Sequence, residues 1–428
     1  MVRRVRAMTV LRGNLRPPGP YPDTHAAGPG KDGRTEGQID AVVFERRLST
    51  GVPAVRHVAG TEGPPSGAYD VDVVILALDR AEDTVAAIRS ALDQTGVSRH
   101  VIVVDQGSRP EALACLAEVA RGRDDVTLVA VNRNLGVPGG RNLGTSLGHG
   151  RIVVGLDNDA EFDAPETVAR MAAALDADPG LAALGCRIIV DSTGKDDLTS
   201  WGYPISLLPR AGDTFDSSTF VGAGHAIRRA AWDDAGGYDD RLFFCWEEYD
   251  FCLRAISRSW RARYRGDIVI RHKVSPERRV AWSGQRWFHF VRNRLYIERK
   301  HGASWLALAP RILAYFAKAA RNGCLPDTAR ALWAAIGLSR GMQQTPLSPA
   351  AREYLRRTDI ALRGSVLTRL RQEIFAALPG TGAQATEASM RATISGDGGP
   401  ESAAMTHSAN SWRFLTPRTS VSIGNDRA

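Results

Sequence analysis

Two aspartates, Asp157 and Asp159, follow directly after the apolar run Ile152–Leu156 and are separated by a single residue. Carboxylate oxygens are ligands that Mg²⁺ and Mn²⁺ prefer, and Mg²⁺ usually keeps positions open for water and substrate phosphates. The pair therefore predicts a metal site that can hold a diphosphate at the end of a strand. Asp-x-Asp alone is a weak signal, because aspartate is also an ordinary turn residue.

A glycine-rich segment, Asn132–Gly144, lies between an expected strand and an expected helix. Glycine lets the backbone approach a ligand closely, and a helix N-terminus favours anions. Arg141 adds a fork of donors that suits phosphate. The segment is not G-x-G-x-x-G, and no acidic residue follows at the dinucleotide spacing, so a Rossmann cofactor site is disfavoured. The alternative is a glycine turn that lets helix and sheet pack closely.

An acidic cluster opens an expected helix around residues 246–254. Helical spacing places Glu247, Asp250 and Arg254 on one face, where Asp250 and Arg254 can pair. Glu248 is about 100° away. We therefore expect the charge network to hold Glu247 and to leave Glu248 able to deprotonate a hydroxyl group. The alternative is that these acidic residues only complement the helix dipole.

His272 follows the strand-like segment Asp267–Ile270. A histidine at a strand end is a candidate metal ligand or acceptor contact. The alternative is a structural or solvated histidine.

These residues need a scaffold, and the pattern around them alternates between strand and helix. Apolar runs predict strands at 71–78, 101–104, 126–131 and 152–156, and helical spacing predicts helices at 81–94, 110–121, 138–148 and 165–175. Such alternation favours an α/β fold with a mainly parallel sheet covered by helices. Ligands bind at the carboxyl ends of strands in such sheets, where Asp79 and Asp105 also occur.

Composition excludes several classes of protein. The chain has 428 residues, 43% hydrophobic and 24% charged, which argues against a disordered or fibrous protein. Its five cysteines are scattered without a C-x-x-C pair, so neither a disulfide framework nor a cysteine zinc site is expected. No apolar run of about 18 residues predicts a membrane span. The net charge of +8 fits nucleic acid, an anionic membrane surface, phosphorylated substrates or simply a solvated arginine-rich surface.

The motifs, taken in order, resemble family 2 glycosyltransferases of the GT-A fold, most closely the rhamnosyl- and galactofuranosyl-transferase-like members. The resemblance covers about residues 70–302. The motifs that carry it are Asp79-Arg80, Asp105-Gln-Gly-Ser108, Asn134-x-Gly136-x-x-Gly-Gly-Arg141-Asn142-x-Gly144, Asp157-x-Asp159, Gly236-Gly-Tyr-Asp239, Trp246-Glu-Glu248-x-Asp250-x-x-x-Arg254 and His272.

The resemblance implies an inverting, metal-dependent sugar transfer from a UDP-, dTDP- or GDP-linked donor. The acceptor would be a glycan, a lipid-linked sugar or a small-molecule hydroxyl, and nucleic acid is not expected as a partner. Mg²⁺ or Mn²⁺ is the implied cofactor. The implied roles are donor or nucleotide binding for Asp79, Asp105, Arg141, Asn142 and Asp157, metal binding for Asp157, Asp159 and His272, and the catalytic base for Glu248.

The chain departs from the family pattern at three places. The first strand ends Ala77-Leu-Asp79-Arg80 instead of Thr-Tyr-Asn-Arg, Gln106 replaces a second aspartate, and the base position carries Glu248 instead of the more common aspartate. These changes bear on the nucleobase and on acceptor geometry. Two alternatives to a glycosyltransferase are a nucleotidyltransferase and a non-catalytic GT-A-like binding scaffold.

We expect four regions along the chain: a disordered segment at 1–68, the catalytic domain at 69–302, a C-terminal helical region at 303–377 and a disordered tail at 378–428. In the helical region an apolar stripe is expected at Trp305, Leu308, Ile312, Tyr315 and Phe316, with Arg311 and Lys318 on another face. This stripe predicts helices packed on the catalytic domain. The alternative is docking on a membrane surface. Because the five cysteines are scattered, we expect a protein of the reducing cytoplasm, with peripheral contact at the inner membrane as the second option.

Overall fold

The computed structural model describes residues 53–369 and 374, except for 274–283 and 366. Four apolar runs of the first half form parallel neighbours in one sheet. They are β2 (Val71–Ala77), β3 (Arg99–Asp105), β4 (Val126–Val131) and β5 (Ile152–Leu156). Nearly all of their residues are buried, as expected for strands covered on both faces.

The second half continues the same sheet with mixed strand directions. Its strands are β6 (Ala160–Phe162), β7 (Leu181–Val190), β8 (Thr214–Ser217), β9 (Gly224–Arg228) and β10 (Arg261–His272). The described residues form a ten-stranded sheet in the order β1-β4-β3-β2-β5-β9-β7-β10-β6, with β8 also paired to β10. Strand β9 runs antiparallel to both β5 and β7, so the prediction of a mainly parallel sheet is confirmed for β2 to β5 and the remainder is mixed.

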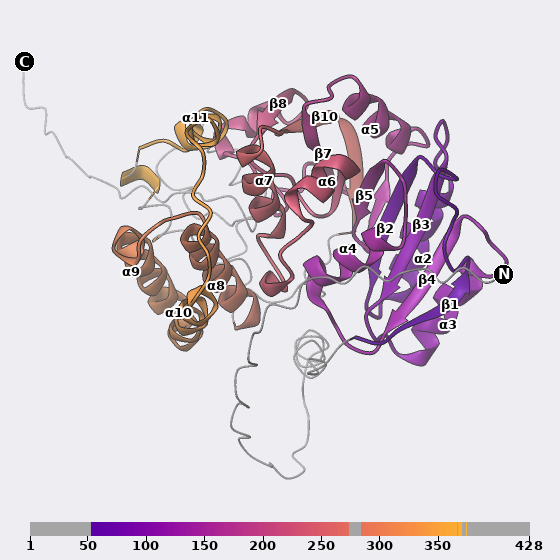
Figure 1. The fold of residues 1–428 in the computed structure, drawn as a ribbon, viewed down its shortest axis with the longest axis horizontal. Coiled ribbons are helices and arrows are strands. Elements are labelled where there is room, and N and C mark those ends of the chain that lie inside the picture. Colours follow the sequence, from indigo (N-terminus) through magenta and orange to yellow (C-terminus); the bar gives the residue numbers. More distant parts are fainter. Residues whose placement is uncertain (1–52, 274–283, 366, 370–373, 375–428) are drawn as a thin grey trace, which may run out of the picture. The chain divides into compact units, whose positions relative to one another are not determined.

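Alternating residues of the central strands face different helices. Val73 and Ile75 pack with residues of α2 (Ala81–Leu92), α3 (Pro110–Ala120) and α5 (Thr167–Asp176). Val74 points to the opposite face, where Leu143 of α4 (Gly136–Ser146) covers it. Figure 1 shows these helices flanking the strands. The sheet is therefore a rigid layer whose strand ends hold the intervening loops in fixed positions.

A helical part follows the sheet. Its helices are α6 (Arg229–Ala235), α7 (Glu247–Ser257), α8 (Gln285–Lys300), α9 (Trp305–Asn322), α10 (Leu325–Ser339) and α11 (Pro349–Thr358), with 3-10 turns η1 (Ile205–Arg210), η2 (Asp240–Leu242) and η4 (Ile360–Arg363). Helices α8, α9 and α10 share one apolar cluster, and α11 packs beside α7 in another.

The apolar stripe expected on α9 faces the protein. Leu308 and Tyr315 are buried in the cluster of α8 to α10, and Ile312 packs against it. Lys318, which we expected on another face, is fully buried as well, and its ammonium lies 6.0 Å from the ring centroid of Trp287. The apolar stripe of α9 therefore packs against the neighbouring helices α8 and α10.

The expected terminal segments fall mostly outside the described residues, namely 1–52 and 375–428. Residues 53–68 are described, and they correct the prediction of disorder for 1–68 in that part. Strand β1 (Val55–Gly60) pairs antiparallel with β4, and Val58 and Ala59 pack against the main core. The short run Val55–Gly60 has little apolar periodicity of its own, so its order depends on the β4 edge. Within the described part of the chain, no helix combines the length and apolarity needed to cross a membrane.

Candidate active site

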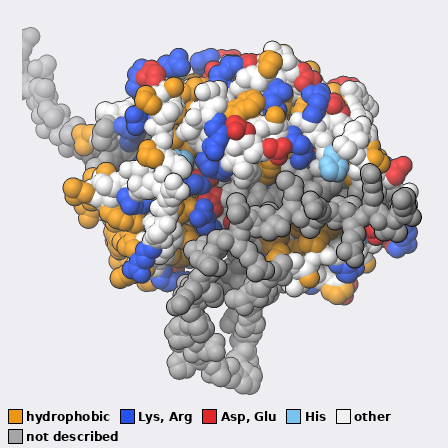
Figure 2. All heavy atoms as spheres, in the orientation of Figure 1, with side chains coloured by type: hydrophobic (Ala, Val, Ile, Leu, Met, Phe, Trp, Pro, Cys, Tyr) orange, Lys and Arg blue, Asp and Glu red, His pale blue; other side chains and the backbone are white. Residues whose placement is uncertain are grey.

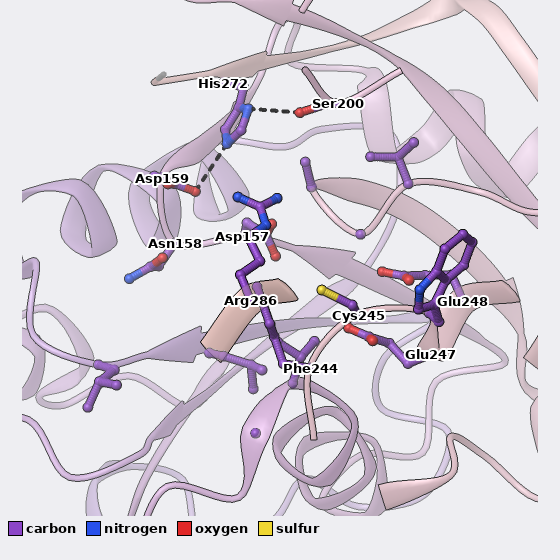
Figure 3. A pocket seen from close by; sticks show the side chains of 18 of the residues that line it. Asp157, Asn158, Asp159, Ser200, Phe244, Cys245, Glu247, Glu248, His272 and Arg286 are labelled. Atoms are coloured by element: carbon purple, nitrogen blue, oxygen red, sulfur yellow. Dashed lines mark hydrogen bonds and ion pairs between the residues drawn. The ribbon is translucent and has the colours of Figure 1, made fainter. Parts of the chain in front are cut away.

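A cavity of about 400 Å³ opens at the carboxyl ends of β2 and β5. Four predicted site residues from three separate parts of the chain line it together: Asp157, Asp159, Glu248 and His272. Figure 3 shows the two aspartates and the histidine on one side and Glu247 and Glu248 on the other. The fold thus brings together the residues expected for metal binding and the residue expected as base.

Asp159 is held by two cationic partners. Its Oδ2 accepts a hydrogen bond of 2.7 Å from the Arg80 guanidinium, and its Oδ1 lies 3.5 Å from Nε2 of His272. Burial alone would raise the pKa of Asp159, but His272 and Arg80 outweigh burial and lower it to about 2. Asp159 is therefore ionised throughout the neutral range.

His272 lies between two carboxylates. Its Nδ1 is 2.8 Å from Oδ2 of Asp197, which is almost fully buried, and 3.4 Å from the Ser200 hydroxyl. Burial alone would lower the pKa of His272, but the bonds to Asp159 and Asp197 raise it to about 10. Because Asp197 fixes Nδ1, the other ring nitrogen is directed toward Asp159 and the pocket, which is how second-shell carboxylates orient metal-binding histidines.

Asp157 is paired from behind by the glycine-rich segment. Arg141 of α4 is buried, and its guanidinium donates to Oδ1 of Asp157 at 2.9 Å and to the Val74 carbonyl. We predicted Arg141 near the diphosphate site. In the structure Arg141 lies behind the pocket wall and binds Asp157, which lines the pocket.

Three other residues, which we predicted to bind the nucleotide-sugar donor, do not line this pocket. Asp79 accepts from the Arg109 backbone N–H at 2.8 Å, which ties the turn after β2 to the start of α3. Asp105 is buried and accepts from the backbone N–H groups of Gly107 and Ser108. The Asn142 side chain exchanges two 2.9 Å hydrogen bonds with the Tyr238 backbone. In this structure all three shape loops next to the pocket.

Glu248 and Glu247 both face the cavity from the first turn of α7. Burial raises the pKa of Glu248 to about 7. Burial and the neighbouring Glu248 raise the pKa of Glu247 well above its ordinary value, and its Oε2 has no hydrogen-bond partner. A Cβ added at Gly222 would lie 2.4 Å from Oε1 of Glu248, so a larger residue there would displace the end of that side chain.

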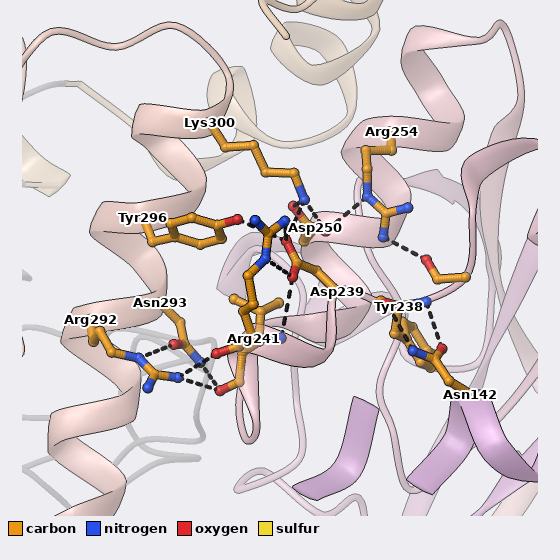
Figure 4. Close-up of polar contacts among 12 residues, drawn as sticks. Asn142, Tyr238, Asp239, Arg241, Asp250, Arg254, Arg292, Asn293, Tyr296 and Lys300 are labelled. Carbon is orange, nitrogen blue, oxygen red and sulfur yellow. Dashed lines mark hydrogen bonds and ion pairs between the residues drawn. The ribbon is translucent and has the colours of Figure 1, made fainter. Parts of the chain in front are cut away.

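The expectation that a charge network holds Glu247 is wrong. Asp250 does pair with Arg254, at 2.9 Å, but the further partner of Asp250 is the Lys300 ammonium at 2.9 and 3.0 Å. Lys300 also donates to Asp239, which closes a buried network between α7, α8 and η2 (Figure 4). The first turn of α7 begins with Trp246 in a left-handed conformation, and Glu247 enters the pocket instead of joining this network.

The segment that carries the two glutamates has an unusual backbone. Phe243, Cys245 and Trp246 have φ values of 61°, 69° and 74°, a left-handed region that non-glycine residues seldom adopt. Asn293, fully buried on α8, donates from one amide nitrogen toward the carbonyls of Leu242, Phe244 and Cys245 at 2.7–2.9 Å. The Asn293 amide thus holds this strained segment in place (Figure 4). Strained backbone persists only where surrounding contacts fix it, and it is common at functional sites.

Arg286 is a pocket residue that the sequence analysis did not identify. It lies in the first turn of α8 and extends into the cavity toward Asp157 (Figure 3). Its only sequence signal is a basic residue before the apolar pattern of a helix, which does not separate it from the many other arginines.

The donor set fits a divalent cation that shares its coordination with a substrate. Two carboxylates and an oriented imidazole border the cavity, a combination that suits Mg²⁺ or Mn²⁺. Within residues 53–369, apart from the undescribed stretches, no three His, Cys, Asp or Glu side chains already form a metal-binding cluster. Asp157, Asp159 and His272 are the residues that would hold such an ion.

Comparison with known proteins identifies part of the chain. Residues 72–236 match the family model described as glycosyl transferase family 2. The chain is also 37% identical over 123 residues to the succinoglycan biosynthesis protein ExoO of Rhizobium meliloti (strain 1021). This match covers 29% of the chain and 33% of the relative, so the chain spans about a third of the curated relative's length.

Solved structures show a more distant likeness. The mannosyltransferase PcManGT from Pyrobaculum calidifontis, in complex with GDP-Man and Mn²⁺, is 20% identical with a TM-score of 0.41, covering 79% of this chain and 91% of that one. GalNAc-T7 with UDP, GalNAc and Mn²⁺ is 14% identical with a TM-score of 0.48, covering 68% and 56%. At these values the likeness does not extend to ligands or activity.

Proposed function

Because residues 72–236 belong to glycosyl transferase family 2 and lie in a GT-A-type mixed sheet, we propose that the chain is an inverting glycosyltransferase. It would move a sugar from a nucleotide-diphospho-sugar to an acceptor hydroxyl. The observation that carries this proposal is one cavity with Asp157, Asp159 and His272 on one side and Glu248 on the other. The two sides offer a place for a diphosphate and a base for an incoming hydroxyl.

The donor side gathers charge of the kind that a diphosphate needs. Asp157, Asp159 and His272 would hold Mg²⁺ or Mn²⁺, and the bound ion would stabilise negative charge on the departing diphosphate. Arg80 and Arg286 also line the cavity and can donate to phosphate oxygens. Asp105, which we expected to contact the nucleotide, is buried and does not line the cavity. The proposal therefore includes UDP-, dTDP- and GDP-linked donors alike.

The acceptor side favours Glu248 over Glu247 as base. A base must be deprotonated near neutral pH, and the pKa of Glu248 is about 7, whereas burial and Glu248 keep the pKa of Glu247 well above its ordinary value. The acceptor oxygen would bond to the anomeric carbon while the bond from that carbon to the diphosphate oxygen breaks. The hydroxyl proton would pass to the Glu248 carboxylate, and the configuration at the anomeric carbon would invert.

The test uses the purified full chain with Mg²⁺ or Mn²⁺ and a panel of UDP-, dTDP- and GDP-sugars. We expect release of nucleoside diphosphate that chelation abolishes and that Asp159→Ala sharply reduces, with an inverted linkage in the product. Pyrophosphate release from a nucleoside triphosphate would instead indicate a nucleotidyltransferase. Donor binding without turnover, under any metal and with simple sugar acceptors, would indicate a binding scaffold.

A further inference from the structure

The outer face of α9 is apolar although it faces solvent. Leu306 is 84% exposed and Leu313 is 69% exposed. Pro310, Ala317 and Ala320 continue the same stripe at helical spacing, so from Leu306 to Ala320 the stripe carries no charged side chain over about four turns, and the exposed Arg321 follows it. A surface helix normally turns polar residues to water, and its apolar stripe to the core. Helix α9 has its core stripe on the opposite side and so is apolar on both.

Helix α10 extends this exposed surface. It contacts α9 and packs on α8, and it exposes Trp333 by 70% and Leu325 by 44%. We call these side chains the outer apolar patch: Leu306, Pro310, Leu313, Ala317, Ala320, Leu325 and Trp333. Figure 2 shows hydrophobic side chains gathered over this helical part of the molecule, at the lower left. Large exposed apolar residues that gather in this way mark an interaction surface.

The charge of the same region indicates what covers the patch. Residues 285–363 carry fourteen Lys and Arg against four Asp and Glu, an excess of ten, whereas the whole chain has an excess of eight. This excess belongs to the whole stretch from α8 to η4; α9 and α10, which carry the patch, hold four Lys and Arg against one Asp, a net charge of +3. Beside the patch, Asp327 is the one acidic residue of α9 and α10, and it lies 3.3 Å from Arg330. Two copies of so basic a surface would repel each other, whereas an anionic surface would attract it.

We propose that the outer apolar patch docks in the headgroup layer of a membrane that contains anionic phospholipids. Exposed leucines on α9 and an exposed tryptophan on the adjoining α10, with arginines on both helices and without a spanning helix in the described residues, are the chemistry of an interfacial helix pair. Arg311, Arg321 and Arg330 of this helix pair, and Arg340 directly after α10, would contact lipid phosphates. The docking does not depend on the proposed sugar transfer, since the patch shares no residue with the cavity.

The test is co-sedimentation of the full chain with vesicles, without any sugar nucleotide. We expect binding to vesicles of phosphatidylcholine and phosphatidylglycerol in equal amounts, weaker binding in high salt, and little binding to phosphatidylcholine alone. The double variant Leu306→Glu/Leu313→Glu should lower the partition coefficient about tenfold or more, because two exposed leucines that would enter the headgroup layer are replaced by anions. Val55→Glu, which changes an exposed apolar residue on β1, is the matched control and should bind like the parent.

Several results would overturn the proposal. Equal binding to both kinds of vesicle, no binding to either, or unchanged binding by the double variant would each do so, provided that the variant keeps the parent's melting temperature. Sedimentation velocity without lipid is the second measurement. A dimer that the double variant abolishes would make the patch a self-association surface instead.

Discussion

At the scale of single residues, the adjacent Glu247 and Glu248 differ in how far burial in the pocket raises their pKa values. We predict that Glu248→Gln lowers turnover by about 10²–10⁴-fold, the usual contribution of a general base, with little change in donor affinity. Because the pKa of Glu248 is about 7, activity of the parent should fall as pH drops through that value. Turnover, donor binding and the pH profile are the measurements, and Glu118→Gln, on the exposed side of α3, is the matched control.

The opposite result would reassign the base. If Glu248→Gln keeps near-normal turnover while Glu247→Gln is inactive and folded, Glu247 takes the role.

Glu247 leads to a separate prediction about stability. Its raised pKa means that the folded protein keeps a proton that the unfolded chain releases above the ordinary glutamate value of about 4.3. The stability linked to Glu247 is thus complete below that pH and is lost as pH rises toward the folded value. Glu247→Gln should therefore be more stable than the parent at about pH 8, and the advantage should shrink at about pH 4.

Urea unfolding of both proteins at the two pH values measures this difference. An equal difference at both values would show that the proton on Glu247 is not involved.

At the scale of elements, one buried charge network joins α7 to α8. Burial alone would raise the pKa of Asp250, but the hydrogen bond from His301 and the charges of Arg254 and Lys300 hold it well below its usual range. We predict that Asp250→Asn costs about 3–5 kcal/mol of unfolding free energy, because it leaves buried cations under-compensated. The contribution of Asp250 is present above its ordinary pKa and is lost on acidification.

Urea unfolding of Asp250→Asn measures this cost, and Lys300→Met in the Asp250→Asn background should recover part of it. A stable Asp250→Asn protein without turnover would instead make Asp250 a catalytic group.

Sequence patterns predicted most elements but not this network. The apolar run at residues 71–77 and the helical spacing at 81–92 depend on local periodicity, and the structure has a strand and a helix there. The pocket side of Glu247 could not be predicted, since ideal helical geometry does not include the left-handed start at Trp246. Nor does spacing reveal that Asn293, on another helix, fixes that start. Long-range contacts decided these details.

Strand β1 likewise shows what local pattern omits. Its six residues gain order by pairing with β4, more than sixty residues later. The positions of Asp157 and Asp159, by contrast, were predictable because ligands bind at the carboxyl ends of strands in sheets of this kind, whereas Glu248 enters the pocket from the helix α7.

At the scale of the whole molecule, the edge strand decides where the chain can be shortened. We predict that a variant lacking residues 1–52 and 375–428 retains turnover. Removing residues 53–68 as well should cost roughly 2–4 kcal/mol, from the lost packing of Val58 and Ala59 and the lost ladder to β4. It should also promote aggregation, because β4 would become an unpaired edge. Unfolding and light scattering compare the two variants, and equal behaviour would contradict the role of β1.

The strand order also has a consequence for the newly made chain. Strands β1 to β5 form one block that has been synthesised at residue 156, and among the described strands only β5 of this block has a further partner, β9. Strand β6, directly after Asp159, pairs only with β10 among the described strands, and β10 ends at residue 272. At about 5–20 residues per second, translation separates these two events by several seconds or more. During that interval the first five strands can fold on the ribosome. The segment that carries both aspartates is not yet held by the pairing of β6 with β10.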